Sequence, residues 1–90
     1  MVLSSTKTHQ LASVLADHIP DGFQLEIRND GEISTFRYKR IADEVWCQEA
    51  MSNLLIEYAI AGTEAIADGI LRSVAQKFHD YDALGSDKDG

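Results

Sequence analysis

The first twenty residues carry the hydrophobic pattern of a single helix. The apolar positions that recur on one helical face are Leu11, Val14, Leu15 and Ile19. Pro20 ends the pattern, because the residue before a proline is pushed out of the helical region. We therefore expect a helix over residues 6–19, whose first turn is capped by Ser4, Ser5 or Thr6.

The next segment predicts a β-hairpin. Phe23, Leu25 and Ile27 alternate with polar residues, and so do the apolar residues after the turn signal Asn29-Asp30-Gly31. A two-residue Asp30-Gly31 loop sets Leu25 opposite Phe36, and Phe23 opposite Tyr38, on one apolar face. A three-residue loop sets charged or polar residues opposite Phe23 and Leu25. Because a one-residue slip moves side chains from the core to solvent, the pattern favours the two-residue loop.

The pattern of apolar residues over 43–81 predicts a helical region. The positions that keep one helical phase are Cys47, Met51, Leu54, Leu55, Tyr58, Ala65, Ile66, Ile70, Val74, Phe78 and Tyr81. A straight helix of this length would measure about 60 Å, which is too long for a compact domain of this size. Either the helix breaks near Gly62-Thr63, or it stays whole and packs against a second copy.

These patterns predict one α+β domain over residues 1–84. It consists of an N-terminal helix, a β-hairpin, and one long or Gly62-broken C-terminal helical region, in the order α-β-β-α(-α). Residues 85–90 contain only glycine, serine, lysine and aspartate, and we expect them to form a flexible tail.

Charge and cysteine content indicate which partners and which cellular compartment to expect. Fifteen acidic and eight basic residues give a net charge of −7, which disfavours general attraction to DNA or to an anionic membrane. The single cysteine, Cys47, forms no internal disulfide and favours a reducing, cytoplasmic compartment. The first ten residues lack the pattern of a signal peptide. The apolar stretch 54–71 contains three carboxylates, so no membrane span is expected.

Catalytic and metal-binding patterns are weak. The three histidines are scattered along the chain: His9, His18 and His79. None has the spacing at which two imidazoles on one helix share a metal. The neighbours of Cys47 in sequence are mainly acidic and would raise its pKa, so a small core residue is expected rather than a nucleophile. Nucleotide-binding glycine loops and nucleophile-elbow motifs are lacking. The sequence therefore predicts a protein that is not an enzyme and holds no metal or cofactor.

The hairpin is the most basic part of the chain. Residues 23–40 carry a net charge of +1, with four basic and three acidic residues, whereas the remainder carries −8. The candidate partner-binding residues are Arg28, Arg37, Lys39 and Arg40. Such a ribbon could meet an acidic protein surface or enter a DNA groove. It could also be a solvated face on which Glu26 pairs with Arg37 across the strands.

Small residues recur every four positions at Ala61, Ala65 and Gly69. A glycine inside a helix costs about 1 kcal/mol relative to alanine, so its presence favours a close helix contact within the chain or between two chains. The candidate residues for dimer or helix packing are Tyr58, Ala61, Ala65, Ile66, Gly69 and Ile70.

The function that these observations favour is a small acidic protein–protein interaction module, a regulator, inhibitor or small chaperone, that forms a homodimer through its surplus apolar surface. One alternative is a nucleic-acid-binding regulator that uses the basic hairpin. The other is a DNA-mimicking inhibitor of a nuclease, whose spaced carboxylates would imitate phosphates. Those carboxylates are Glu57, Glu64, Asp68, Asp80 and Asp82.

Overall fold

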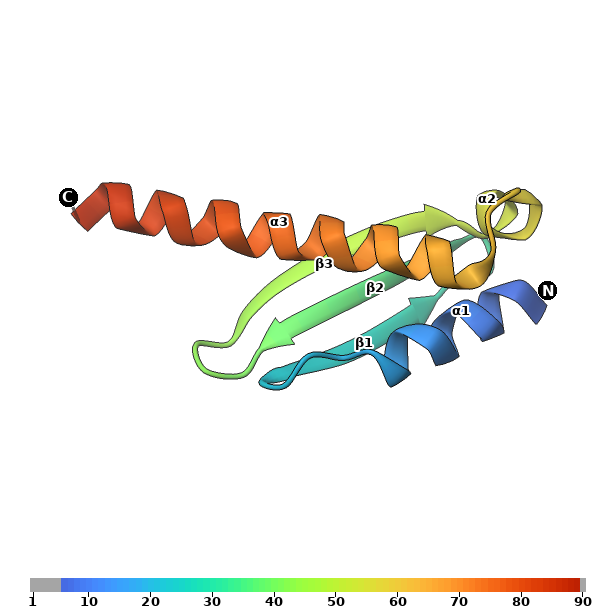
Figure 1. Cartoon of the computed structure of the whole chain (residues 1–90), viewed down its shortest axis with the longest axis horizontal. Coiled ribbons are helices and arrows are strands. Elements are labelled where there is room, and N and C mark those ends of the chain that lie inside the picture. The colour runs from blue at the N-terminus through green and yellow to red at the C-terminus, as the bar shows by residue number, and fades with distance from the viewer. Residues whose placement is uncertain (1–5, 90) are drawn as a thin grey trace.

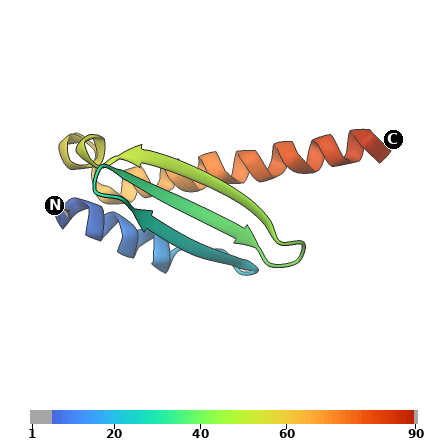
Figure 2. The ribbon, with the colours of Figure 1, turned by 180° about the vertical axis from the view of Figure 1, so that it is seen from behind.

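A computed structural model describes residues 6–89 as three helices and one antiparallel sheet (Figure 1). The elements are α1 (Thr6–Asp17), β1 (Phe23–Asn29), β2 (Ile33–Arg40), β3 (Val45–Ser52), α2 (Asn53–Tyr58) and α3 (Thr63–Asp89). The strands lie in the order β1-β2-β3. Helices α1 and α3 lie on one face of the sheet, and the view from behind shows that the other face is bare (Figure 2).

The α+β class and the N-terminal helix are confirmed. Leu11 and Leu15 of α1 are fully buried, as their spacing predicts. The helix ends at Asp17, two residues before the expected end, and the N–H of His18 closes the last turn by donating to the carbonyl of Leu15. Of the expected cap residues, Ser4 and Ser5 lie outside the described residues.

The hairpin is also confirmed, but its register differs from the expected one. Leu25 lies opposite Tyr38, and Ile27 opposite Phe36, so the pairing is shifted by two residues and each side chain keeps its predicted face. The loop residues are Gly31 and Glu32 instead of Asp30 and Gly31. Gly31 has a φ of 98° and Glu32 has a negative φ, and positive φ at the first loop residue alone is the geometry of a type II′ turn.

Side-chain hydrogen bonds explain the shift. The carboxylate of Asp30 accepts from the N–H groups of Glu32 and Ile33 at 3.0 and 2.8 Å, and the amide oxygen of Asn29 accepts from the N–H of Gly31 at 2.8 Å. Asp30 therefore satisfies the loop backbone from the last position before the turn, a common role of aspartate.

The prediction of helix from residue 43 was wrong for its first part, because Val45–Ser52 forms the third strand. Cys47 and Met51 were assigned to a helix because they are four residues apart. Four is also an even number, so the same two residues share one face of a strand. In the sheet Tyr38 lies opposite Cys47, and Phe36 opposite Glu49.

Of the two alternatives left open for the helical region, the structure has the break near Gly62, since α2 ends at Tyr58 and α3 begins at Thr63. Ser52 caps α2: its hydroxyl accepts from the N–H of Leu54 at 3.2 Å. At its other end α3 continues through residues 85–89, the segment expected as a tail, because helix propagation is easy once begun and no proline interrupts it. The end of α3 extends beyond the sheet, along a long axis of 48 Å (Figures 1 and 2).

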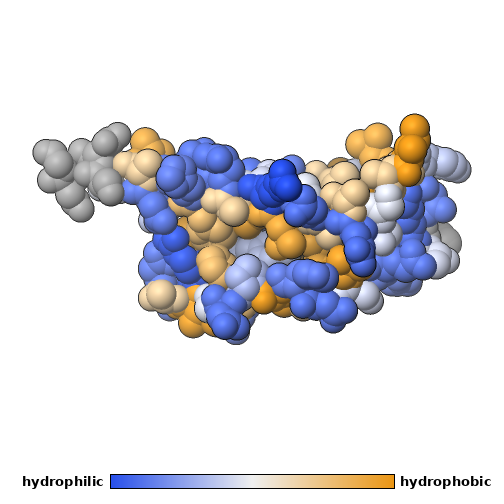
Figure 3. All heavy atoms as spheres, viewed as in Figure 1, coloured by the Kyte–Doolittle hydropathy of each residue, from blue (hydrophilic) through white to orange (hydrophobic). Residues whose placement is uncertain are grey.

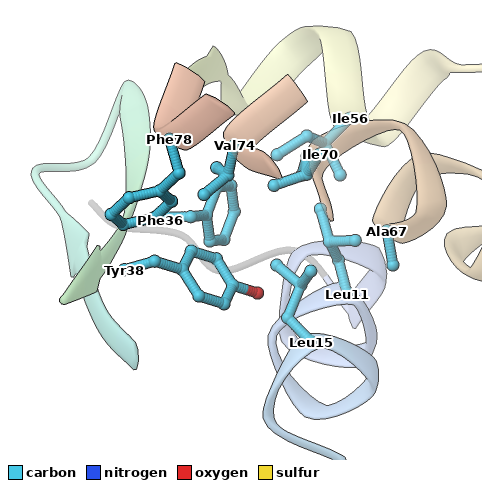
Figure 4. Packing of buried hydrophobic residues seen from close by; sticks show 9 residues of the cluster. All are labelled: Leu11, Leu15, Phe36, Tyr38, Ile56, Ala67, Ile70, Val74 and Phe78. Carbon is cyan, nitrogen blue, oxygen red and sulfur yellow. The ribbon is translucent and has the colours of Figure 1, made fainter. Parts of the chain in front are cut away.

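The core lies between the covered face of the sheet and the two long helices (Figure 4). Its residues are Leu11, Leu15, Phe36, Tyr38, Ile56, Ala67, Ile70, Val74 and Phe78. The ring of Phe23 meets the ring of Phe78 edge to face, with 5.1 Å between centroids. All three strands and all three helices therefore take part in one core or pack against it.

Candidate interaction surfaces

The bare outer face of the sheet is positively charged. Arg28, Arg37 and Lys39 share it, as predicted from their alternation with buried residues. The guanidinium carbon of Arg37 lies 4.2 Å from the ring centroid of Trp46, and Nζ of Lys39 lies 5.7 Å from it. β3 thus adds an aromatic side chain, 40% exposed, to the basic surface of the hairpin.

The three cations of this outer face differ in how far they are neutralised. Nη1 of Arg37 lies 2.7 Å from Oε1 of Glu26, its cross-strand partner, and Nζ of Lys39 lies 3.6 Å from Oε1 of Glu44. Arg28 is exposed and forms no ion pair with any residue in the range 6–89. A net positive charge therefore remains on this face of an otherwise acidic chain.

Arg40 does not belong to this surface, although the sequence grouped it with the other three. It follows Phe36 and Tyr38 in the period of β2, so its side chain turns toward the helices, and its guanidinium carbon lies 5.1 Å from the ring centroid of Phe78. Its charge is taken up by Asp43 and Asp82, at 2.7 and 2.9 Å. The structure thus assigns Arg40 a role within the fold.

A second surface lies at the end of the molecule that carries α2. Of the apolar residues in α2, only Ile56 is buried, whereas Leu54, Leu55 and Tyr58 are 67, 65 and 78% exposed. Ile60, in the loop that follows, is fully exposed. We call these four residues the α2 patch, and hydrophobic residues gather at this end in Figure 3. Four of the six residues of α2 are apolar, more than one buried side of a surface helix needs, and residues 53–58 already contain that signal in the sequence.

The three small residues at four-residue spacing, Ala61, Ala65 and Gly69, do not all lie on one helix. Ala65 and Gly69 lie on an exposed side of α3, while Ala61 lies in the loop before the helix. A Cβ atom built on Gly69 would meet no other atom within 4 Å, so the expected close contact is not made within the chain. Together with Ile66 and Ile70, the two small residues line a shallow groove beside Glu49 and Met51 of β3. Helix α1 packs on another side of α3.

The third surface is the open edge of β3. The N–H of Asn53 donates to the carbonyl of Glu32 at 2.7 Å, which sets the phase of the β2–β3 ladder. Because pairing alternates along an antiparallel ladder, the N–H and C=O groups of Trp46, Gln48 and Ala50 point away from β2. The carbonyl of Gln48 accepts from Nζ of Lys77 at 2.5 Å.

Beside this edge, Glu49 forms a polar cluster with α3. Its Oε1 accepts from Nζ of Lys77 and from the hydroxyl of Ser73, both at 2.8 Å. These two hydrogen bonds, the one from Lys77 first, lower the pKa of the Glu49 carboxyl. The cluster therefore holds a carboxylate and an ammonium group next to a strand edge that pairs with no other described strand.

Groups with reactive potential are few in the described part of the chain. Cys47 is half-buried against the core, and this burial raises the pKa of its thiol. Among the described side chains, those of residues 6–85, no three of histidine, cysteine, aspartate or glutamate are placed to share a metal ion. Of the carboxylates considered for DNA mimicry, Asp82 is paired with Arg40 and Asp68 with Arg72.

Among the described helices, none is both long enough and apolar enough to span a membrane. No protein-family model matches the chain, and neither a curated protein nor a solved structure is significantly similar to it.

Proposed function

We propose that this protein is a non-catalytic, cytoplasmic protein–protein interaction module that forms a homodimer. The observation that supports the dimer is the α2 patch. Leu54 and Tyr58 are one helical turn apart on the side of α2 that faces away from the buried Ile56, and both are more than half exposed. Apolar side chains gathered in this way on a small domain are typical of an interface.

A second copy fits this patch because the chain carries a matching apolar surface at its other end. Tyr81 and Leu84 on the projecting end of α3 are 51 and 66% exposed. Figure 1 shows this end of α3 and α2 at opposite ends of the long axis. A two-fold axis between the ends would bring each α2 patch onto Tyr81 and Leu84 of the other copy, which makes a closed, isologous contact.

Sedimentation of the full chain at micromolar concentration tests the dimer. We expect a mass of about 20 kDa, twice the 10.0 kDa of one chain. The double variant Leu54→Ser, Tyr58→Ser should fall to the monomer mass and keep its circular dichroism spectrum. Ile27→Ser, which removes a 38% exposed side chain from β1 on the other edge of the sheet, is the matched control and should remain dimeric. A wild-type mass near 10 kDa at all concentrations would refute the homodimer.

The outer sheet face supports binding of an acidic protein segment as the second part of this function. Arg28 is without an ion-pair partner in the described structure, and Trp46 offers a flat apolar contact beside Arg37 and Lys39. Cations around an exposed aromatic ring attract carboxylates and raise the rate of association. If the protein were instead a nucleic-acid-binding regulator, it would bind nucleic acid through this same face.

The triple variant Arg28→Ser, Arg37→Ser, Lys39→Ser separates these two partners. An acidic model peptide, such as oligoglutamate, should bind the wild type more weakly as salt is added and should not bind the variant. Glu26→Gln and Glu44→Gln together form the control and should strengthen binding. Salt-dependent binding of duplex DNA by the wild type, lost in the triple variant, would favour the nucleic-acid alternative instead.

A further inference from the structure

We infer that the open edge of β3 is the centre of the dimer contact. In this arrangement β3 pairs antiparallel with β3 of the second copy, with Gln48 opposite its own counterpart. The three strands of each copy then join in one continuous sheet. The inference rests on the proposed homodimer and specifies which surface forms it and in which register.

The backbone of β3 is free to make this pairing. Trp46, Gln48 and Ala50 direct their N–H and C=O groups to the edge, because their neighbours in the strand pair with β2. At this edge the Gln48 carbonyl is held by Lys77. Nζ of Lys77 is also 2.8 Å from Glu49. Lys77 therefore keeps an ion pair when the Gln48 carbonyl accepts instead from an N–H group of the second copy.

The side chains of β3 do little to prevent such pairing. Strand edges that stay free are usually short, or carry prolines or exposed charges. β3 is eight residues long, has no proline or lysine, and its one charged residue, Glu49, is turned toward Ser73 and Lys77 of α3. The opposite edge strand, β1, carries the exposed charges of Glu26 and Arg28.

The rest of the surface is complementary about the same axis. α3 runs back along β3, so the α2 patch lies at one end of the strand, and Tyr81 and Leu84 lie toward the other (Figure 1). Pairing of β3 with its copy aligns these ends. Near the axis each copy presents one carboxylate and one ammonium group, Glu49 and Lys77, which can pair across the interface as well as within a chain.

Charge also selects the register. If Glu49 lay opposite its counterpart, two carboxylates would face each other at the axis, and like charges directly opposite are destabilising. A shift of one residue in each copy sets Gln48 opposite Gln48, and two carboxamides can donate to and accept from each other. In this second register Trp46 lies opposite Ala50 of the other copy.

Cross-linking in the full-length protein tests the register. In a Cys47→Ser background, Gln48→Cys should be joined to its counterpart by a short bis-maleimide, because residues opposite each other in a ladder are about 5 Å apart. Ala50→Cys should not react with its own counterpart, since the two are offset by four residues, about 13 Å. Thr35→Cys on the central strand is the second control and should not cross-link.

A proline tests the hydrogen bonding. The N–H of Ala50 points to the open edge, where proline is tolerated, so Ala50→Pro should keep the fold and its melting temperature within a few degrees and sediment as a monomer. Ala50→Val should remain dimeric. A dimer that survives Ala50→Pro, or cross-links at Ala50→Cys or Thr35→Cys and not at Gln48→Cys, would overturn this inference and leave the homodimer standing. A monomeric wild type would remove both.

Discussion

Arg40 on β2 holds Asp82 on α3 in a two-pronged ion pair. Its Nη1 and Nη2 atoms each lie 2.9 Å from one oxygen of the Asp82 carboxylate, and the same guanidinium binds Asp43 in the turn after β2. These hydrogen bonds lower the pKa of both carboxyl groups below their usual range. The projecting part of α3 is therefore tied to the sheet at the point where the sheet ends.

Loss of this ion pair should loosen the end of α3. In Asp82→Asn, we expect faster amide hydrogen exchange over residues 79–85, with little change over residues 66–75, which are anchored by the core. Asp80→Asn is the matched control, because Asp80 accepts from Gln76 on the same helix and not from the sheet, as far as the described residues go. Equal exchange in the two variants would show that Arg40 does not anchor the helix.

The sequence was most informative where one periodicity excluded the other. In α1, Leu11, Val14 and Leu15 fit only a helix, and in β1 the alternation of Phe23 and Leu25 fits only a strand. The hairpin faces were therefore predicted correctly even though the register was not. A shift of two residues preserves every face, and the loop is fixed by the side chains of Asn29 and Asp30.

The sequence misled where the spacing fits both periods. Cys47 and Met51 share a face in a helix and in a strand, and the inward position between them is occupied by a charged residue, Glu49, which hides the alternation. Its partners Ser73 and Lys77 are more than twenty residues away, so no local pattern reveals them. Because β3 was assigned to a helix, its open edge was not predicted either.

The role of Arg40 was missed for a different reason. The basic composition of the hairpin suggested that Arg40 binds a partner, whereas its ion-pair partner Asp82 lies 42 residues away.

Acid should weaken the contact between β3 and α3 through Glu49. Because the pKa of this carboxyl is lowered from its usual value of 4.5, its contribution to stability is complete above that pH and is lost as the pH falls through the lowered value. Urea unfolding at about pH 6 and pH 3 should show a smaller loss of unfolding free energy in Glu49→Gln than in the wild type. Equal losses would mean that Glu49 titrates alike in the folded and unfolded states.

Cys47 should behave as a structural thiol. Burial against the core raises its pKa, so a thiol reagent near neutral pH should react slowly with the native protein and rapidly in denaturant. Ala75→Cys, in a Cys47→Ser background, supplies a thiol at an exposed position of α3 for comparison. Native labelling of Cys47 as fast as in denaturant would contradict its assignment as a core residue.

Tyr38 offers a test of core polarity. Its side chain is 1% exposed, and its hydroxyl, which points toward Leu11 and Leu15 in Figure 4, has no hydrogen-bond partner in the described part of the chain. A buried hydroxyl without a partner costs about 1–3 kcal/mol, so Tyr38→Phe should leave stability unchanged or raise it by about 1 kcal/mol. Tyr38→Leu should instead lower it by a few kcal/mol through a cavity. A marked loss in Tyr38→Phe, measured by urea unfolding, would reveal a partner for the hydroxyl.

The turn between β2 and β3 contains the one strained backbone position that is not a glycine among residues 6–89. Glu44 has a φ of 59°, in the left-handed region, where a residue with a Cβ atom is disfavoured by about 1–2 kcal/mol. Its side chain is 76% exposed and contributes only a 3.6 Å ion pair with Lys39, so little is lost with it. Glu44→Gly should therefore stabilise the protein by about 0.5–1 kcal/mol, after allowing for the greater freedom of glycine in the unfolded chain. The control is Asp43→Gly at the neighbouring position. It removes an ion-pair partner of Arg40 and should destabilise the protein.

Thermal unfolding of the two variants should give one melting temperature above that of the wild type and one below it. A lower value for Glu44→Gly would mean that the Glu44 side chain stabilises the turn by more than its backbone strain costs.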